Sequence, residues 1–252
     1  MMVDLHCHIL PNVDDGPQDL EESLQMCHIA HRDGIQTIVA TPHFVESRIN
    51  AVPGQLEYAV NALDELNLAL RKEKISLGIK SGFEVALFPE LPEFVERFPA
   101  LTIEGLNKYI LVELPFSQFP LYTDEVLFQL QSRGICPIIA HPERNLGLLR
   151  EPSLLVSLVE RGILAQATAS SFLGESGREA RRALEAWCKK GYIHIVGSDA
   201  HSPERRPPIL SSAHRVLKKW VGTKRADWIM HQVPRQVLAG QEVEANIWVD
   251  AQ

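Results

Sequence analysis

Two histidines one residue apart, His6 and His8, follow a short apolar segment near the start of the sequence. If Val3–His6 forms a strand, side chains two positions apart point to the same side, so both imidazoles face one way. Neighbouring imidazoles on one face can bind zinc, manganese or iron. Two carboxylates, Asp14 and Asp15, come shortly afterwards. A His-x-His pair also arises by chance, so its meaning depends on what the other strands carry.

Seven apolar segments have the length of strands and alternate with helical patterns. The expected strands are Val3–His6, Gln36–Ala40, Ile79–Phe83, Tyr109–Glu113, Cys136–Ala140, Leu164–Ala167 and Ile193–Gly197. The expected helices are Leu20–Arg32, Leu56–Lys72, Asp124–Ser132, Ser153–Glu160 and Arg178–Lys190, with further helical segments near His214–Trp220 and Ala226–His231. Near-continuous apolar strands that alternate with helices are typical of a parallel sheet covered on its outer face. Seven such units predict an α/β protein with a closed or nearly closed barrel, one unit short of the usual eight.

Six of these seven strands carry His, Asp or Glu at their carboxyl ends. The residues are His6, His8, His43, Glu84, Glu113, His141, Asp199 and His201. In a barrel these strand ends converge on one mouth, where active sites lie. A single histidine near a strand end is usually structural, but this joint arrangement predicts a metal site. Because the ligands outnumber what one ion needs, we expect two or three divalent transition-metal ions.

The other five histidines lie away from the expected strand ends and are predicted to be structural or solvated. They are His28, His31, His194, His214 and His231.

The composition is that of an ordinary soluble globular protein of 252 residues. A net charge of -7 does not favour a nucleic acid or an anionic membrane as the partner. No apolar run is long enough to span a membrane, and no secretion signal is visible, so we expect a cytoplasmic protein without membrane insertion. No linker or internal repeat divides the chain, which predicts a single domain over residues 1–252 with a C-terminal helical tail.

The cysteines exclude a cysteine-dependent phosphatase mechanism. Such enzymes use a C-x5-R loop, but the residues six positions after the four cysteines are Val13, Asp33, Pro142 and His194. The scattered cysteines also suggest neither a zinc knuckle nor a disulfide framework. Any phosphatase activity of this chain must therefore depend on metal.

The combined motifs resemble those of the PHP (polymerase and histidinol phosphatase) superfamily of phosphoesterases. The resemblance runs from residue 4 to about residue 208 and implies a distorted seven-stranded, TIM-like (β/α)7 barrel. The segments HCHILPNVDDGP, HPERN and SDAHSPERRPP look most like the bacterial PHP-type protein tyrosine phosphatases of capsule and exopolysaccharide loci. In the histidinol phosphatase branch the positions of Asp15 and Glu113 are usually histidine. The resemblance therefore implies hydrolysis of phosphotyrosine on a protein, expected to be the tail of a bacterial tyrosine kinase.

The resemblance also implies three metal positions, for which Mn²⁺ is the expected ion and Zn²⁺ or iron the alternatives. The implied sets are His6, His8, Glu84 and Asp199 for the first ion, Glu84, Glu113 and His141 for the second, and Asp15, His43 and His201 for the third. Asp14 remains an alternative to Asp15, because the two are adjacent and only one need face inward.

Two arginines are candidates for binding phosphate, since a guanidinium matches phosphate oxygens with two parallel hydrogen bonds. Arg144 lies three residues after His141, and Arg206 lies in the loop after His201. We therefore expect Arg144 and Arg206 to bind substrate, and Arg144, Asp199 and His201 to act in catalysis. The family often has an aromatic residue where this chain has Asn145, which bears on how a phosphotyrosine ring is seated.

Three other functions compete with this interpretation. A histidinol phosphatase, or another small-molecule phosphomonoesterase of the superfamily, would share the metal ligands. A metal-dependent amidohydrolase also begins with His-x-His, but it expects eight strands and commonly a lysine at the end of the fourth, where this chain has Glu113. A non-catalytic metal-binding or scaffold domain would be expected to have lost ligands that this chain keeps.

Overall fold

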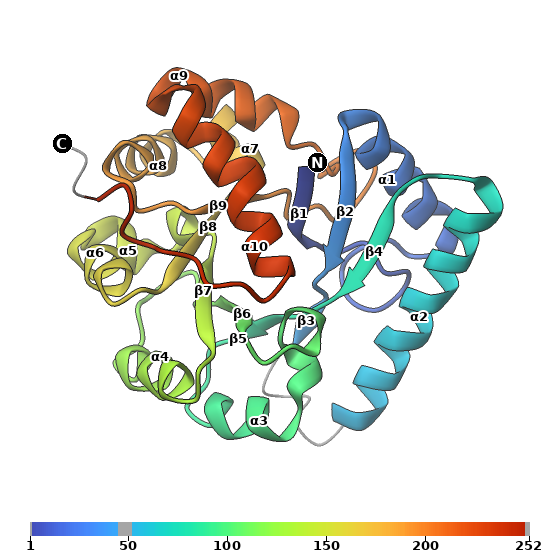
Figure 1. Ribbon diagram of the computed structural model, residues 1–252, viewed down its shortest axis with the longest axis horizontal. Coiled ribbons are helices and arrows are strands. Elements are labelled where there is room, and N and C mark those ends of the chain that lie inside the picture. The colour runs from blue at the N-terminus through green and yellow to red at the C-terminus, as the bar shows by residue number, and fades with distance from the viewer. Residues whose placement is uncertain (1, 45–51, 250–252) are drawn as a thin grey trace.

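The strands form two parallel sheets at the centre of the molecule (Figure 1). Within residues 2–44 and 52–249, which the computed structural model describes, nine strands are present. The first sheet has the order β1 (Met2–Cys7), β2 (Ile35–Ala40) and β4 (Gly78–Ser81). The second has the order β3 (His43–Phe44), β5 (Glu84–Ala86), β6 (Tyr109–Glu113), β7 (Cys136–Ala140), β8 (Leu164–Thr168) and β9 (Ile195–Gly197). The prediction of an α/β protein with parallel strands is confirmed.

Two of the seven expected segments continue, after an interruption, into a second short strand. Between β2 and β3 lies Pro42, which has no backbone N–H to donate to a sheet. Between β4 and β5 lies Gly82, where an added Cβ would lie 2.8 Å from a Val39 methyl group. The register is the same on both sides of the break, with Ala40 opposite Ser81 and His43 opposite Glu84. The residues expected just after these strands therefore open the next ones.

Backbone hydrogen bonds join the first strand to the segment after the last one. The N–H of Asp199 donates to the carbonyl of His6 at 2.8 Å, and the N–H of His8 donates to the carbonyl of Ala200 at 2.8 Å. These bonds bring the carboxyl ends of β1 and β9 side by side, although nearly the whole chain separates them in sequence.

The helices surround the sheets (Figure 1). They are α1 (Leu20–Asp33), α2 (Val52–Glu73), α3 (Leu91–Arg97), α4 (Thr123–Ser132), α5 (Leu146–Arg150), α6 (Ser153–Glu160), α7 (Ala169–Leu173), α8 (Arg178–Lys190), α9 (Ser211–Asp227) and α10 (Val233–Leu238). The predicted bounds of α6 and α8 are confirmed. Helix α1 ends at Asp33 and is capped by Gly34, whose φ of 91° is the left-handed conformation of a helix cap.

The C-terminal helical segments differ from the prediction in their bounds. The segment His214–Trp220 lies inside α9, which bends at Gly222 where φ is 78° and ψ is 165°. The segment Ala226–His231 crosses from the end of α9 into a wide helical turn at Trp228–Gln232. A glycine with these dihedrals breaks the helical hydrogen-bond ladder, which apolar periodicity alone does not indicate.

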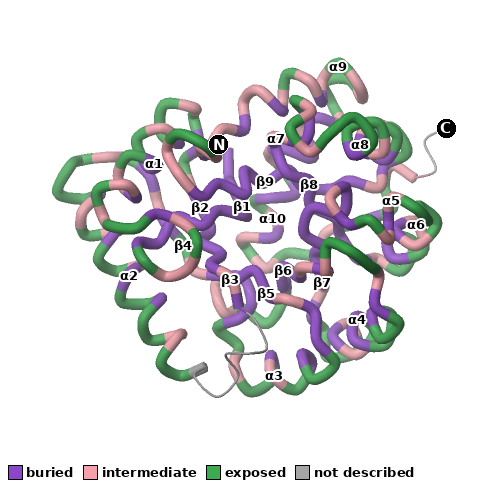
Figure 2. Tube along the Cα trace, turned by 180° about the vertical axis from the view of Figure 1, so that it is seen from behind, coloured by how far each residue is buried: buried purple, intermediate pink, exposed green. Residues whose placement is uncertain are grey.

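The buried residues gather in the strands and on the inner faces of the helices (Figure 2). Among the largest fully buried side chains are Leu5, Ile38, Phe44 and Leu66. In the described part of the chain, no helix has both the length and the apolar character that crossing a bilayer requires.

His194, one of the histidines outside the expected site, gives the fold a pH dependence. The side chain is fully buried, its Nδ1 accepts from the N–H of Ala165 at 3.0 Å, and its Nε2 donates to the carbonyl of Ala245 at 3.0 Å. Both contacts fix the neutral ring, and burial lowers the pKa of His194 to about 4. At pH values between 6.5, the ordinary pKa of histidine, and about 4, the unfolded chain binds a proton at His194 that the folded chain does not.

We therefore expect His194 to cost the fold up to roughly 3 kcal/mol of stability as the pH falls from 6.5 to 4. Denaturant unfolding of wild type and His194→Gln across this range measures the contribution, because glutamine does not titrate. The variant should be less stable at neutral pH but should lose less stability on acidification. Parallel curves for the two proteins would contradict this assignment.

Candidate metal centre

The structure brings all nine candidate ligands to the carboxyl ends of the strands. They come from β1 and the loop after it (His6, His8 and Asp15), from β3 (His43), β5 (Glu84) and the end of β6 (Glu113), and from the segments after β7 (His141) and β9 (Asp199 and His201). The convergence follows from the parallel arrangement, in which every strand points its carboxyl end to the same side.

Glu84 lies in the middle of this cluster. The carboxylate is almost fully buried, and its Oε2 lies 3.3 Å from His6 Nε2, 3.3 Å from His8 Nε2 and 3.1 Å from His43 Nδ1. Its Oε1 lies 2.9 Å from His141 Nε2. Oε2 nevertheless accepts no well-formed hydrogen bond among the described residues. A buried carboxylate oxygen is costly unless something compensates it, and a cation shared with the surrounding imidazoles would do so.

The spacing of the first ligand set fits a common ion. The Nε2 atoms of His6 and His8 are 3.2 Å apart, and Asp199 Oδ1 lies 3.4 Å from His6 Nε2. Two ligands bound at about 2.1 Å to one tetrahedral ion lie about 3.4 Å apart. The residues present therefore fit a divalent transition metal, and both nitrogen and oxygen donors are supplied.

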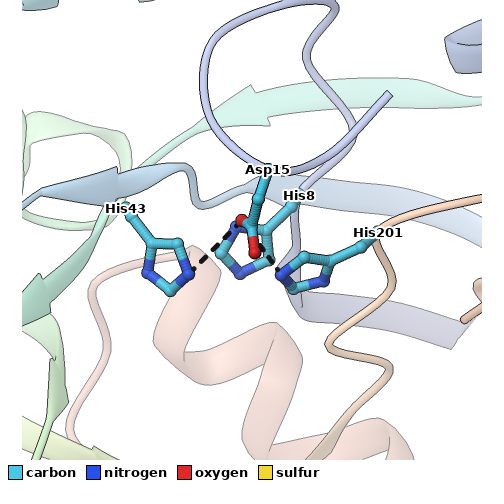
Figure 3. A group of neighbouring side chains, drawn as sticks. All are labelled: His8, Asp15, His43 and His201. Carbon is cyan, nitrogen blue, oxygen red and sulfur yellow. Dashed lines mark ion pairs between the residues drawn. The ribbon is translucent and has the colours of Figure 1, made fainter. Parts of the chain in front are cut away.

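The other two sets share His43. Its Nδ1 faces Glu84 and Glu113, and Glu113 also lies 3.7 Å from His141 Nε2. Its Nε2 faces Asp15 at 3.5 Å. The same Asp15 oxygen, Oδ1, also lies 3.4 Å from His201 Nε2 (Figure 3). The resemblance implied His43 for the third ion alone, whereas in the structure His43 lies within reach of both ligand sets.

Asp14 and Asp15 have different surroundings. Asp14 Oδ2 accepts from His8 Nδ1 at 2.6 Å and from the N–H of His43 at 3.0 Å. Burial would raise the pKa of Asp14, but the hydrogen bond and charge of His8 hold it well below its usual range. Asp15 is 65% exposed and reaches the imidazoles of His43 and His201. Asp15 is thus the candidate ligand, and Asp14 orients the His8 ring from behind, as carboxylates commonly do for metal-binding histidines.

Gln166 orients the His6 ring in the same way, and it was not among the predicted site residues. His6 Nδ1 lies 2.7 Å from Gln166 Oε1, which leaves His6 Nε2 directed at the cluster. An added Cβ at Gly197 would lie 2.7 Å from His6 Cβ and 2.9 Å from Gln166 Nε2, so only glycine fits there. The one sequence signal was a glutamine inside the otherwise apolar strand LAQA.

The electrostatics around His6 and His8 favour positive charge. Burial lowers the pKa of His8, but the hydrogen bond to Asp14 and the nearby carboxylate of Glu84 outweigh it and raise the pKa to about 10. The pKa of His6 is likewise raised to about 8, against its burial, by the charges of Glu84 and Asp199. The surrounding carboxylates therefore stabilise these rings in either the protonated or the metal-bound form. Metal binding must release the protons that the rings carry.

The two candidate arginines meet at Asp199. Its Oδ1 faces the imidazoles, while its Oδ2 lies 2.6 Å from Arg144 Nη1 and 2.7 Å from Arg206 Nη2. Their side chains are 28% and 38% exposed, whereas Asp199 is 2% exposed. Both guanidinium groups thus lie beside the candidate ligands with faces open to solvent.

Asn145, where the family often has an aromatic residue, does not line the site. Its side chain is buried and accepts from the N–H of Leu148 at 2.8 Å. Its amide donates to the carbonyls of Pro115 at 2.7 Å and Gln118 at 2.9 Å. Asn145 therefore holds the loop after β6 in place.

The fold and the ligand cluster define a class: an α/β protein with parallel strands whose carboxyl ends can hold several divalent metal ions. A solved structure of D-hydantoinase, 12% identical, shares the fold with a TM-score of 0.54 over 91% of this chain and 68% of its own. Residues 2–239 match the family described as capsular polysaccharide synthesis, CpsB/CapC. The chain belongs to this family.

Named relatives agree with that assignment. The chain is 38% identical to tyrosine-protein phosphatase YwqE of Bacillus subtilis over 223 residues, which cover 88% of this chain and 86% of YwqE. It is 27% identical to tyrosine-protein phosphatase CpsB of Streptococcus pneumoniae over 245 residues, covering 95% and 99%. A solved structure from work on YwqE and CpsB, described as unique metal-dependent tyrosine phosphatases, matches with a TM-score of 0.86 and 35% identity over 96% of each chain. The resemblance to the capsule-locus tyrosine phosphatases is confirmed.

Proposed function

We propose that this protein is a metal-dependent protein tyrosine phosphatase that hydrolyses phosphotyrosine on a protein. The observation that carries the proposal is the meeting of nine candidate metal ligands and two arginines at one place, with Asp199 facing both groups. The family and the named relatives support the same activity.

The ligands proposed for two or three divalent ions are His6, His8, Asp15, His43, Glu84, Glu113, His141, Asp199 and His201. Mn²⁺ is the proposed ion, and Zn²⁺ or iron would suit the same nitrogen and oxygen donors. When bound, such ions polarise phosphoryl oxygens and lower the pKa of a coordinated water towards ~7, so that hydroxide is available near neutral pH.

The chain's own residues bind and orient the phosphate. Arg144 and Arg206 offer guanidinium N–H groups to the phosphoryl oxygens, whose negative charge grows in the transition state. Asp199 holds both guanidinium groups in place through Oδ2. His201 Nδ1 donates to the carbonyl of Asp199 at 3.1 Å, which directs its Nε2 toward Asp15 and the metal cluster.

The finer features of the proposal concern the fold and the cellular role. The continuous register across the breaks in both sheets and the hydrogen bonds between the ends of β1 and β9 support one distorted seven-stranded PHP barrel in a single domain. The family's association with capsular polysaccharide synthesis supports a bacterial tyrosine kinase tail as substrate and regulation of exopolysaccharide or capsule synthesis as the outcome. Such a kinase tail would be met in the cytoplasm.

A comparison of substrates tests the proposal. We expect kcat/KM to be highest for a phosphotyrosine peptide, lower for a phosphoserine peptide of the same sequence, and lower for histidinol phosphate. All three are measured with the same protein at one metal loading. If histidinol phosphate is preferred by tenfold or more, the protein is a small-molecule phosphatase of the superfamily instead.

A further inference from the structure

A cleft of about 660 Å³ opens directly beside the two arginines. Its lining includes the charged Asp199, Arg144 and Arg206 and the apolar Phe116, Leu146 and Leu149. Apolar side chains that share a cleft with two cationic groups match a substrate that joins a phosphate to an apolar body. The ester oxygen of phosphotyrosine connects such a phosphate to an aromatic ring.

Phe116 is the aromatic side chain in this lining. The ring is 47% exposed, and it stacks on His141 with ring centroids 5.6 Å apart and planes at 16°. The Arg144 guanidinium carbon lies 4.9 Å from the centre of the Phe116 ring. Phe116 therefore contacts both a candidate metal ligand and an arginine proposed to bind phosphate, and nearly half of its surface is exposed.

A single exposed phenylalanine is common on protein surfaces and by itself indicates nothing. Phe116 differs because the segment after β7 fixes the loop that carries it. The N–H of Leu146 donates to the Phe116 carbonyl at 2.8 Å, and the Asn145 amide binds the carbonyls of Pro115 and Gln118. Gly147 approaches so closely that an added Cβ would lie 2.6 Å from the Phe119 nitrogen. The backbone that carries the exposed ring is thus held in one place, as a preformed binding surface requires.

We propose that Phe116 is a specificity-determining residue, which packs against the aromatic ring of phosphotyrosine while Arg144 and Arg206 bind its phosphate. The inference rests on the proposed phosphatase function. It explains why the protein would hydrolyse aryl phosphates such as phosphotyrosine in preference to alkyl phosphates such as phosphoserine. Aromatic pairs add a favourable interaction beyond the burial of area, and serine has no ring to make it. Asn145 positions the loop and does not touch the substrate.

The test is the ratio of kcat/KM for a phosphotyrosine peptide to that for a phosphoserine peptide of the same sequence. Phe116→Ala should lower this ratio about tenfold, the scale of a lost aromatic contact together with its buried area. Phe116→Tyr keeps the ring and should retain the wild-type ratio. Phe128→Ala removes the side chain of a 61% exposed phenylalanine on α4 and is the matched control. It should leave kcat/KM for both peptides unchanged.

The ratio separates ring binding from an indirect effect through Arg144. If Phe116→Ala slows both peptides equally, Phe116 only supports the arginine and the inference is wrong. An unchanged ratio with unchanged rates also overturns it. If the wild-type protein itself shows no preference for phosphotyrosine, the proposed function fails, and this is recognised before any variant is made.

Discussion

Exhaustive chelation is expected to abolish hydrolysis of a phosphotyrosine peptide, and added Mn²⁺ is expected to restore it. The physical reason lies in the buried cluster around Glu84, whose Oε2 is surrounded by three imidazole nitrogens without a well-formed hydrogen bond. Without an ion, the described residues near the phosphate site offer two arginines but no group able to activate water at neutral pH to the same extent. Elemental analysis of the chelated protein confirms that the metal has left.

A single variant gives the same loss without chelator. Glu84→Gln removes the charge that faces four of the candidate ligands, and we expect it to lose bound metal and activity together. Glu73→Gln is the matched control, because Glu73 is a partly exposed carboxylate that pairs with the exposed His28 on α1. The control should keep its metal content and rate. Full activity in wild-type protein shown to be free of metal would contradict the proposed chemistry.

The candidate ligands were predictable because one geometrical rule covers them. Parallel strands place their carboxyl ends together, so His141 and Asp199 could be assigned to one site from their positions after apolar strands. No knowledge of loop conformation was needed for that step. The breaks after β2 and β4 did not matter either, because the register continues across them and His43 and Glu84 still lie opposite each other.

The supporting residues were not predictable in the same way. Asp14 and Asp15 are adjacent and chemically equal, and only the turn of the loop decides that one lies behind His8 while the other faces His201. Gln166 contacts His6 across 160 positions of sequence, so no local pattern could reveal the pair. The place of Phe116 depends on hydrogen bonds from Asn145 to the backbone, and these involve a loop with no periodicity.

Arg144→Ala is expected to lower kcat on a phosphotyrosine peptide roughly 100-fold or more, the scale seen when one transition-state donor is removed. Metal content should not change, because Arg144 is not a candidate ligand and Asp199 keeps its contact with Arg206 at 2.7 Å. The remaining guanidinium still balances the buried carboxylate, so the fold should also be preserved. The measurement combines steady-state kinetics with elemental analysis of the same samples.

Two further variants decide what a loss of activity means. Arg133→Ala removes a guanidinium that pairs with Glu93 and Glu96 at the surface, and it should leave the rate unchanged. Arg206→Ala should also slow the reaction while retaining metal, because Arg206 contacts the same Asp199 oxygen as Arg144. If Arg144→Ala keeps near-normal turnover while Arg206→Ala does not, the phosphate is bound by Arg206 alone. Loss of metal in Arg144→Ala would instead show that the arginine maintains the ligand cluster through Asp199, and that its effect on rate is indirect.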